Sequence, residues 1–461
     1  MRLKSLDVFR GIAIASMILV NNPGSWKQVY PPLDHAEWHG CTPTDLVFPF
    51  FLFIVGCAMS FSLSKYQYGS VNKVIAQRAP HLIEKFHSLC DCFAKTLAMT
   101  LALTQAYWSK YAQTAKKAET AESQVTEKQE QTNAEKIPIS TDSDPLHLLK
   151  NPLPNFPASN IYWRIVRRAG ILFGLGLLLN TSSIALDVLL NSAPVENFGK
   201  IRIMGVLQRI GLAYFISAIA ILNLSPRRQK LLAVAVLLGY WALLFVFAVG
   251  GYTAYELTPE GYLGGYVDRL ILGSQHLYKG GPFDPEGLLS TLPASVTVLI
   301  GYFTGEWLRV QPMKTRTSVN LVISGLCCLV IGHLWGFSFP INKQLWTSSY
   351  VVFTAGWALL LLAACYETIE VQKWKWGWPF EIMGLNAIFV FVASGIVARI
   401  LLKTHIGSGK SAASTYTWIY ENWFVPWAGL LNGSLAFAVT AVLFWWLILY
   451  GMYRRGWEIK I

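Results

Sequence analysis

Long apolar runs bounded by charged residues constrain the fold of this chain more than any other feature. A hydrocarbon core of about 30 Å is crossed by a helix of about 20 mostly apolar residues, which pairs its own backbone groups. About ten runs approach this length, the shorter ones needing the charged residues just before them: 11–26, 46–64, 169–186, 210–226, 231–255, 287–305, 317–342, 344–366, 382–398 and 422–453. The sequence therefore predicts an all-α polytopic membrane bundle of about ten transmembrane helices.

The composition excludes other classes of protein. Hydrophobic residues make up 53% and charged residues 14% of the chain, against about 25% charged in soluble domains. A soluble enzyme, a disordered chain and a disulfide scaffold are therefore disfavoured. Cys90 and Cys92 have no second cysteine pair at metal-ligand spacing, so no metal site is expected. Asp7 and Arg10 precede the first run and no cleavage site follows it, which predicts a retained helix.

Charge distribution predicts the orientation and the domain organisation. Lys and Arg are more frequent in the connections on the side that carries both ends of the chain, which puts both termini in the cytoplasm. Residues 1–66 contain the first two spans and the external loop between them. Residues 67–160 form a cytoplasmic insertion, with an amphipathic helix followed by a charged and Pro-rich linker. Residues 161–461 contain the remaining eight spans.

Several polar side chains fall within predicted spans, where their burial is costly. Asp7 and Arg10 can pair on one face of the first helix, either as a topogenic ion pair or as part of a site. Gln208 and Arg209 open the fourth span, where the arginine needs a carboxylate or an anion. Asn386 has no capping role and is expected to face the bundle interior. Polar groups at both ends predict a path through the bundle.

The external loop after the first span carries an unusual set of polar residues. Asn21 ends the first helix, and His35, His39 and Asp45 follow before the second. Thr44 or Asp45 can cap the second helix, which accounts for one of these residues. A histidine, with a free pKa of about 6.5, suits general-base work near neutral pH. The loop is thus either an inert polar surface or a site of acid–base chemistry.

Other external residues add to this face. Asp284 and Glu286 precede the sixth span, where they either cap that helix or contribute to a site. Asn342 and Lys343 precede the eighth span, and Trp38 lies in the first loop. These residues are candidate ligands for a polar molecule at the external face.

Short motifs spread along the chain, taken in order, resemble the heparan-α-glucosaminide N-acetyltransferase family. They are SLDVFRGIA at 5–13, HAEWHG at 35–40, TDLVFPFFLFI at 44–54, GVLQRI at 205–210, DPEG at 284–287, NKQLWTSSY at 342–350 and GLN at 384–386. Together they cover nearly the whole chain apart from the insertion. Compared with the lysosomal enzyme, the chain is expected to lack the lumenal N-terminal domain and the extra helix that precedes the motifs.

The resemblance implies a transmembrane acetyltransferase. Such an enzyme takes acetyl-CoA from the cytoplasm and acetylates the amine of a glucosamine-type sugar on the other side. His35 matches the active-site histidine of the family, and Asn21 matches its helix-end asparagine. The missing lumenal domain implies a bacterial homologue in the inner (cytoplasmic) membrane.

The implied chemistry fits these residue types. His35 can accept the amine proton, or become acetylated and pass the group on. Asn21 can donate a hydrogen bond to the thioester oxygen as negative charge develops there. Asp45 or Asp34 can orient the imidazole. The expected acetyl-CoA ligands are Asp7, Arg10, Gln208, Arg209, Asn386, Arg454 and Lys460. The expected acceptor ligands are Trp38, His39, Asp284, Glu286, Asn342 and Lys343.

Three other functions are compatible with a polar path through a bundle. A secondary transporter for a sugar or an organic anion uses buried charges on broken helices. An O-acetyltransferase of envelope polysaccharide has the same donor and the same topology. A structural membrane scaffold needs no buried charges and fits least well. The expected partners are the lipid bilayer, acetyl-CoA and a sugar, without nucleic acid, and a homodimer is left open.

Overall fold

The computed structural model describes residues 3–63, 66, 159–191, 193–248, 251, 253, 255–407 and 413–459. The predicted insertion lies outside the described residues, apart from its last two positions, which begin a long helix. Cys90, Cys92 and Lys460 also lie outside them.

The prediction of an all-α membrane bundle is confirmed. Every predicted span coincides with a helix or a bent pair of helices: α1 (Lys4–Asn21), α2 (Val47–Leu63), α5 (Ser159–Asn191), α6 (Val206–Asn223), α7 (Pro226–Val246), α9 (Thr291–Val310), α10 (Thr315–Gly336), α11 (Ser348–Cys365), the pair α12 (Trp378–Leu385) and α13 (Ala387–Lys403), and α15 (Val425–Arg454). Shorter elements occupy the connections: η1 (Pro31–Leu33), η2 (Pro43–Leu46), η4 (Val195–Lys200), α8 (Leu263–Leu272), η5 (Ser274–His276), η6 (Tyr278–Gly280), η7 (Tyr366–Val371), α14 (Thr415–Ile419) and η8 (Tyr420–Phe424). The short strands β1 (His405–Ile406) and β2 (Ala413–Ser414) pair antiparallel.

Contacts between distant connections define two ends of the bundle. At one end, the backbone N–H of Ser5 at the start of α1 donates to Glu370 just beyond α11, at 3.0 Å. At the other, Lys343 between α10 and α11 approaches His35 between α1 and α2, with 3.0 Å between Nζ and Nδ1. α1 and α11 therefore run in opposite directions between these two ends. We call these the Arg10 end and the His35 end, after the residues that matter below.

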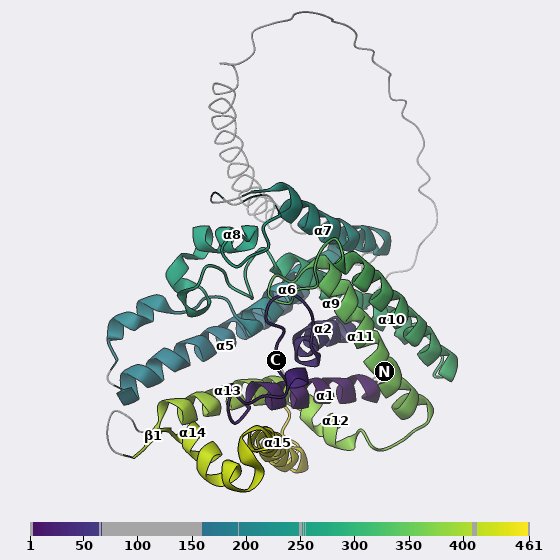
Figure 1. Ribbon diagram of the computed structural model, residues 1–461. Coiled ribbons are helices and arrows are strands. Elements are labelled where there is room, and N and C mark those ends of the chain that lie inside the picture. Colours follow the sequence, from purple (N-terminus) through teal and green to yellow (C-terminus); the bar gives the residue numbers. More distant parts are fainter. Residues whose placement is uncertain are drawn as a thin grey trace, which may run out of the picture. The chain divides into compact units, whose positions relative to one another are not determined.

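The helices form an inner group enclosed by an outer group (Figure 1). In α2, α6 and α11, 67% of the residues in the most apolar membrane-spanning stretch are buried. The corresponding share is 17% in α5 and α10, 22% in α15 and 28% in α7. α1 and α9 are also mostly buried. The outer helices therefore present apolar surface outward, and the inner ones pack on protein.

The inner position of α1 and α9 explains a difference from simple hydropathy. Among the described residues, seven helices are long and apolar enough to cross a membrane, or eight with the α12–α13 pair. α1 and α9 fall outside this set because they carry charged residues such as Asp7, Arg10 and Glu306. A helix surrounded by other helices does not need a uniformly apolar surface, because its neighbours are protein and not lipid.

Glycines bring α2 and α9 into backbone contact. A Cβ atom on Gly56 would lie 1.9 Å from the carbonyl oxygen of Val298, and one on Gly301 would lie 2.0 Å from that of Phe53. Small residues of this kind let membrane helices approach closely. This contact fixes α2, whose first turn carries part of the site described next.

Candidate functional site

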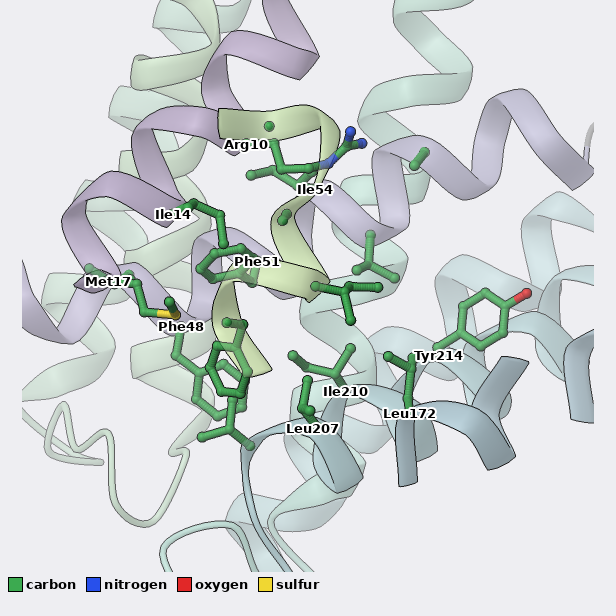
Figure 2. Close-up of a pocket in the computed structure, with 18 of the residues that line it drawn as sticks. Arg10, Ile14, Met17, Phe48, Phe51, Ile54, Leu172, Leu207, Ile210 and Tyr214 are labelled. Carbon is green, nitrogen blue, oxygen red and sulfur yellow. The ribbon is translucent and has the colours of Figure 1, made fainter. Parts of the chain in front are cut away.

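A cavity of about 880 Å³ lies between the inner helices α1, α2 and α6, the outer helix α5, and the break between α12 and α13. Arg10 lines it at one end, and Asn21 and His35 line it at the other. The span Pro43–Leu63 contributes lining residues from Thr44 to Ser62, which at 1.5 Å per residue is about 27 Å of helix. Figure 2 shows Arg10 at the top of the view, with apolar side chains forming the walls below it: Ile14, Met17, Phe48, Phe51, Ile54, Leu172, Leu207 and Ile210.

His35 and Asp45 form a hydrogen-bonded pair at the far end of this cavity. His35 Nδ1 lies 2.6 Å from Asp45 Oδ1. The carboxylate is 2% exposed, whereas the imidazole is 50% exposed. Because the carboxylate can only accept, Nδ1 carries the proton and Nε2 is left as the basic nitrogen, an assignment made from the hydrogen bond. This is the arrangement in which an imidazole can accept a proton at Nε2.

The local sequence explains why Asp45 is so placed. Thr42 and Asp45 form a capping box at the start of η2, with Pro43 at the first position. Asp45 Oδ2 accepts from the backbone N–H groups of Thr42 at 3.0 Å and Ala36 at 3.1 Å. The cap predicted at Thr44 or Asp45 therefore begins earlier, because Thr42 is the N-cap residue. Asp45 supports that cap with one carboxylate oxygen, and its other oxygen faces the imidazole.

Lys343 completes a charged cluster with this pair. Its Nζ lies 3.3 Å from Asp45 Oδ1 and 3.0 Å from His35 Nδ1. Lys343 also lines the cavity. The sequence predicted Lys343 as an acceptor ligand and gave no indication of its contact with His35, which joins residues 308 positions apart.

Asn21 lies on the cavity wall at the end of α1. The neighbouring Asn22 uses its side-chain amide to donate to the carbonyl of Ile18 at 2.8 Å. In the described part of the chain, no hydrogen bond engages the Asn21 side chain. Its amide is therefore available to a molecule in the cavity.

A second charged cluster borders the same end. Arg202 donates to Asp284 through Nη2 at 2.6 Å and Nε at 2.9 Å, and it also pairs with Glu286. Burial disfavours the charged form of Arg202, but its hydrogen bonds to Asp284 and the charges of both carboxylates outweigh this and raise its pKa. Asp284 is fully buried and caps its own turn by accepting from the N–H of Glu286. Glu286 lines the cavity, whereas Asp284 supports it.

The remaining acceptor candidates hold the loops around the cluster. Trp38 donates its indole N–H to the carbonyl of Leu257 at 2.8 Å. Asn342 accepts from the N–H of Leu345 and lies 3.4 Å from His39 Nδ1. Burial lowers the pKa of His39, which favours a neutral ring. These residues are near the site but are not part of the cavity wall.

Two of the candidates near the start of α6 point away from the cavity. The side chain of Gln208 occupies the space beside Gly176 of α5. Arg209 is fully buried, where its Nη2 donates to Ser290 and its guanidinium lies 5.0 Å from the ring centre of Trp346. Their positions around the first turn of α6 direct both side chains into the protein.

The Arg10 end is less polar than the sequence suggested. Arg10 pairs with Asp7 at 2.9 Å and lines the cavity. Arg168 of α5 also lines it and was missed, because a lone basic residue before an apolar run looks like ordinary topogenic charge. Arg454 donates to the hydroxyl of Tyr450 and is exposed. Among the residues that the structure describes, no group of three or more His, Cys, Asp or Glu could hold a metal ion.

Comparison with known proteins agrees with the ordered motifs. Residues 2–106 match a family described as a domain of unknown function (DUF5009). Heparan-alpha-glucosaminide N-acetyltransferase of Homo sapiens is 24% identical, over 99% of this chain and 60% of its own length. The Mus musculus protein of the same name is 24% identical, over 86% of this chain and 54% of its own length. The resemblance is therefore confirmed, and the chain spans somewhat more than half the length of these relatives.

Proposed function

We propose that this protein is a transmembrane acetyltransferase that moves an acetyl group from acetyl-CoA to the amine of a glucosamine-type sugar. The observation that carries the proposal is a cavity joining Arg10 at one end of the bundle to the His35–Asp45 pair at the other. The similarity of this protein to heparan-alpha-glucosaminide N-acetyltransferases over most of the chain supports the same reaction.

The donor enters at the Arg10 end in this proposal. Coenzyme A carries several phosphate charges, whose burial without cations is prohibitive. Arg10 and Arg168 supply cations at the cavity wall there. The apolar middle of the cavity, formed by residues such as Phe51 and Ile210, suits the uncharged pantetheine arm. The thioester then lies beside His35, while the nucleotide stays outside.

His35 acts as the base in this mechanism. The sugar amine must lose a proton before it attacks the thioester carbon, and Nε2 of His35 accepts that proton. The new C–N bond forms as the C–S bond breaks. The nitrogen then gives up a second proton, which leaves with the thiolate of coenzyme A, and the first proton passes from His35 to solvent. Asp45 holds the imidazole tautomer, and the Asn21 amide donates to the carbonyl oxygen as it becomes negative.

Glu286 and Lys343 are the acceptor ligands that the cavity supports best. Both line its wall near His35. The Glu286 carboxylate can attract the sugar ammonium before deprotonation, and Lys343 can bind a hydroxyl or an acidic group of the sugar. Trp38, His39 and Asn342 then act indirectly, by holding the surrounding loops.

The Arg10 end faces the cytoplasm in this proposal, and the His35 end faces outward. The excess of Lys and Arg in the connections at the Arg10 end supports this orientation. We place the protein in a bacterial inner membrane, where acetyl-CoA is available on one side and envelope sugars on the other.

The activity is tested by incubating the purified protein with acetyl-labelled acetyl-CoA and a panel of sugars. The panel pairs each amino sugar with its counterpart that carries a hydroxyl in place of the amine. We expect label only on the amino sugars, with one thiol of coenzyme A released for each product. Label on both members of a pair would indicate an O-acetyltransferase, and the absence of thiol release would indicate a transporter.

We expect Asp45→Asn to lower kcat on the order of 100-fold, because an amide cannot hold the imidazole tautomer as a carboxylate does. Asp34→Asn is the matched control. Among the described residues, Asp34 Oδ1 accepts only from the backbone N–H of His35, at 2.8 Å, so this variant should stay within a few-fold of the wild type. Steady-state kinetics on both variants measure kcat. Equal losses of kcat would show that Asp45 has no special role in orienting the imidazole.

We expect Arg10→Gln to raise the KM for acetyl-CoA about tenfold with little change in kcat, because it removes a cation that binds donor and transition state alike. Arg454→Gln is the control, since Arg454 lies at the same end but off the cavity. Its KM should be unchanged. A larger effect of Arg454→Gln than of Arg10→Gln would show that the donor phosphates bind elsewhere.

A further inference from the structure

The residues that follow α15 fold back against the break between α12 and α13. The helix axes of the pair differ by 77° at this break, where Asn386 separates them. Asn386 Nδ2 donates to the carbonyl of Trp457 at 3.0 Å, and the backbone N–H of Ile459 donates to Asn386 Oδ1 at 2.8 Å. One side-chain amide thus pairs with the backbone as a peptide group does in a sheet. We call residues 456–459 the strap.

The strap reaches the cavity. Ile459 is among its lining residues, together with Leu385 and Ala387 on either side of Asn386. Arg10 lines the same end. Asn386 itself is only 2% exposed. The strap therefore narrows the cavity at the end where the proposed donor enters.

The side chain of Asn386 links the exposed strap directly to the break between α12 and α13. Trp457, Glu458 and Ile459 are all exposed. The two hydrogen bonds to Asn386 are between neutral groups, which together favour the attached state on the order of 30-fold. A segment held in this way can detach without disturbing the helices. The sequence predicted Asn386 as a ligand of acetyl-CoA, but its side-chain amide is hydrogen-bonded to the strap.

We propose that the strap is a gate at the Arg10 end of the cavity and that Asn386 is its latch. In the latched state, Ile459 occupies part of the opening. Release of the two hydrogen bonds withdraws Ile459 and widens the passage for a bulky polar molecule. The identification of that molecule as coenzyme A rests on the proposed function, whereas the gate itself rests on the geometry of the strap.

The gate is tested by the accessibility of a reporter on the cavity wall. Ala58→Cys places a thiol on the cavity wall, and its reaction with a bulky charged thiol reagent is followed by mass spectrometry of the peptide that contains it. We expect Asn386→Leu to speed this reaction about tenfold. Ile459→Pro removes the N–H donor and leaves Asn386 intact, and it should have a similar effect. Equal rates in all proteins would overturn the proposal.

Asn223→Leu is the matched control. Asn223 lies at the same end of the bundle and also uses its side chain in hydrogen bonds, with Tyr162 and Ile219, but it does not line the cavity. Its variant should leave the reaction rate of the thiol unchanged. An increase equal to that of Asn386→Leu would mean that general loosening, and not the latch, controls access.

Coenzyme A itself then tests the link to function. We expect its association rate to rise several-fold in Asn386→Leu and Ile459→Pro, with no change in Asn223→Leu. Faster thiol modification without any coenzyme A binding in the wild type would support the gate and contradict the proposed donor. Coenzyme A binding at equal association rates in all proteins would support the donor and contradict the gate.

Discussion

Replacement of His35 by alanine is expected to lower acetyl transfer on the order of 1,000-fold, because it removes the imidazole that accepts the amine proton in the proposed mechanism. Binding of coenzyme A should be retained, since His35 lies at the opposite end of the cavity from Arg10. Steady-state kinetics measure the first effect, and titration calorimetry with coenzyme A measures the second.

His39→Ala is the matched control for this prediction. His39 is in the same loop and is also exposed, but its ring lies against Asn342 and does not line the cavity. We expect its loss to cost less than tenfold in rate. An inactive His39→Ala protein together with an active His35→Ala protein would show that His39, and not His35, is the base.

Gly56→Ala is expected to destabilise the protein by on the order of 3 kcal/mol or more, because overpacking here separates two helices. The new Cβ would lie 1.9 Å from the carbonyl oxygen of Val298 and 2.8 Å from the backbone nitrogen of Tyr302. Backbone atoms cannot give way as a flexible side chain can. The fraction of protein that stays monodisperse after heating in detergent measures the effect.

Gly239→Ala makes the same chemical change on α7, where the added Cβ meets nothing within 4 Å. There, alanine should be neutral or stabilising by up to about 1 kcal/mol, because it has the higher helix propensity. If the two variants were equally stable, α2 and α9 could not be in backbone contact.

The sequence predicted the helices well because lipid imposes a long apolar run on most spans. Boundaries were less accurate, since α7 ends at Val246 although apolar sequence continues beyond it. The first-loop candidates also lie close together, because His35 and Asp45 are only ten residues apart. The sequence predicted Thr44 or Asp45 as the helix cap, whereas Thr42 is the N-cap of η2 and Asp45 completes its capping box. Their roles remain predictions.

Long-range pairings could not be predicted. Lys343 reaches His35 across 308 positions, and Arg202 reaches Asp284 across 82. Such contacts depend on how the helices are ordered around the cavity, which hydropathy does not encode. Arg209 illustrates the same limit, because a rotation of one position on α6 decides whether a residue faces the cavity or the protein interior.

The central claim is that the acetyl group crosses the bundle from the Arg10 end to the His35 end. It is tested most directly in sealed vesicles with a labelled amino sugar trapped inside and acetyl-CoA, which cannot cross lipid, supplied outside. We expect N-acetylated sugar to accumulate inside vesicles that contain the wild-type protein, with free coenzyme A outside, and neither to form with His35→Ala. Product that forms only when donor and sugar share one compartment would contradict the account.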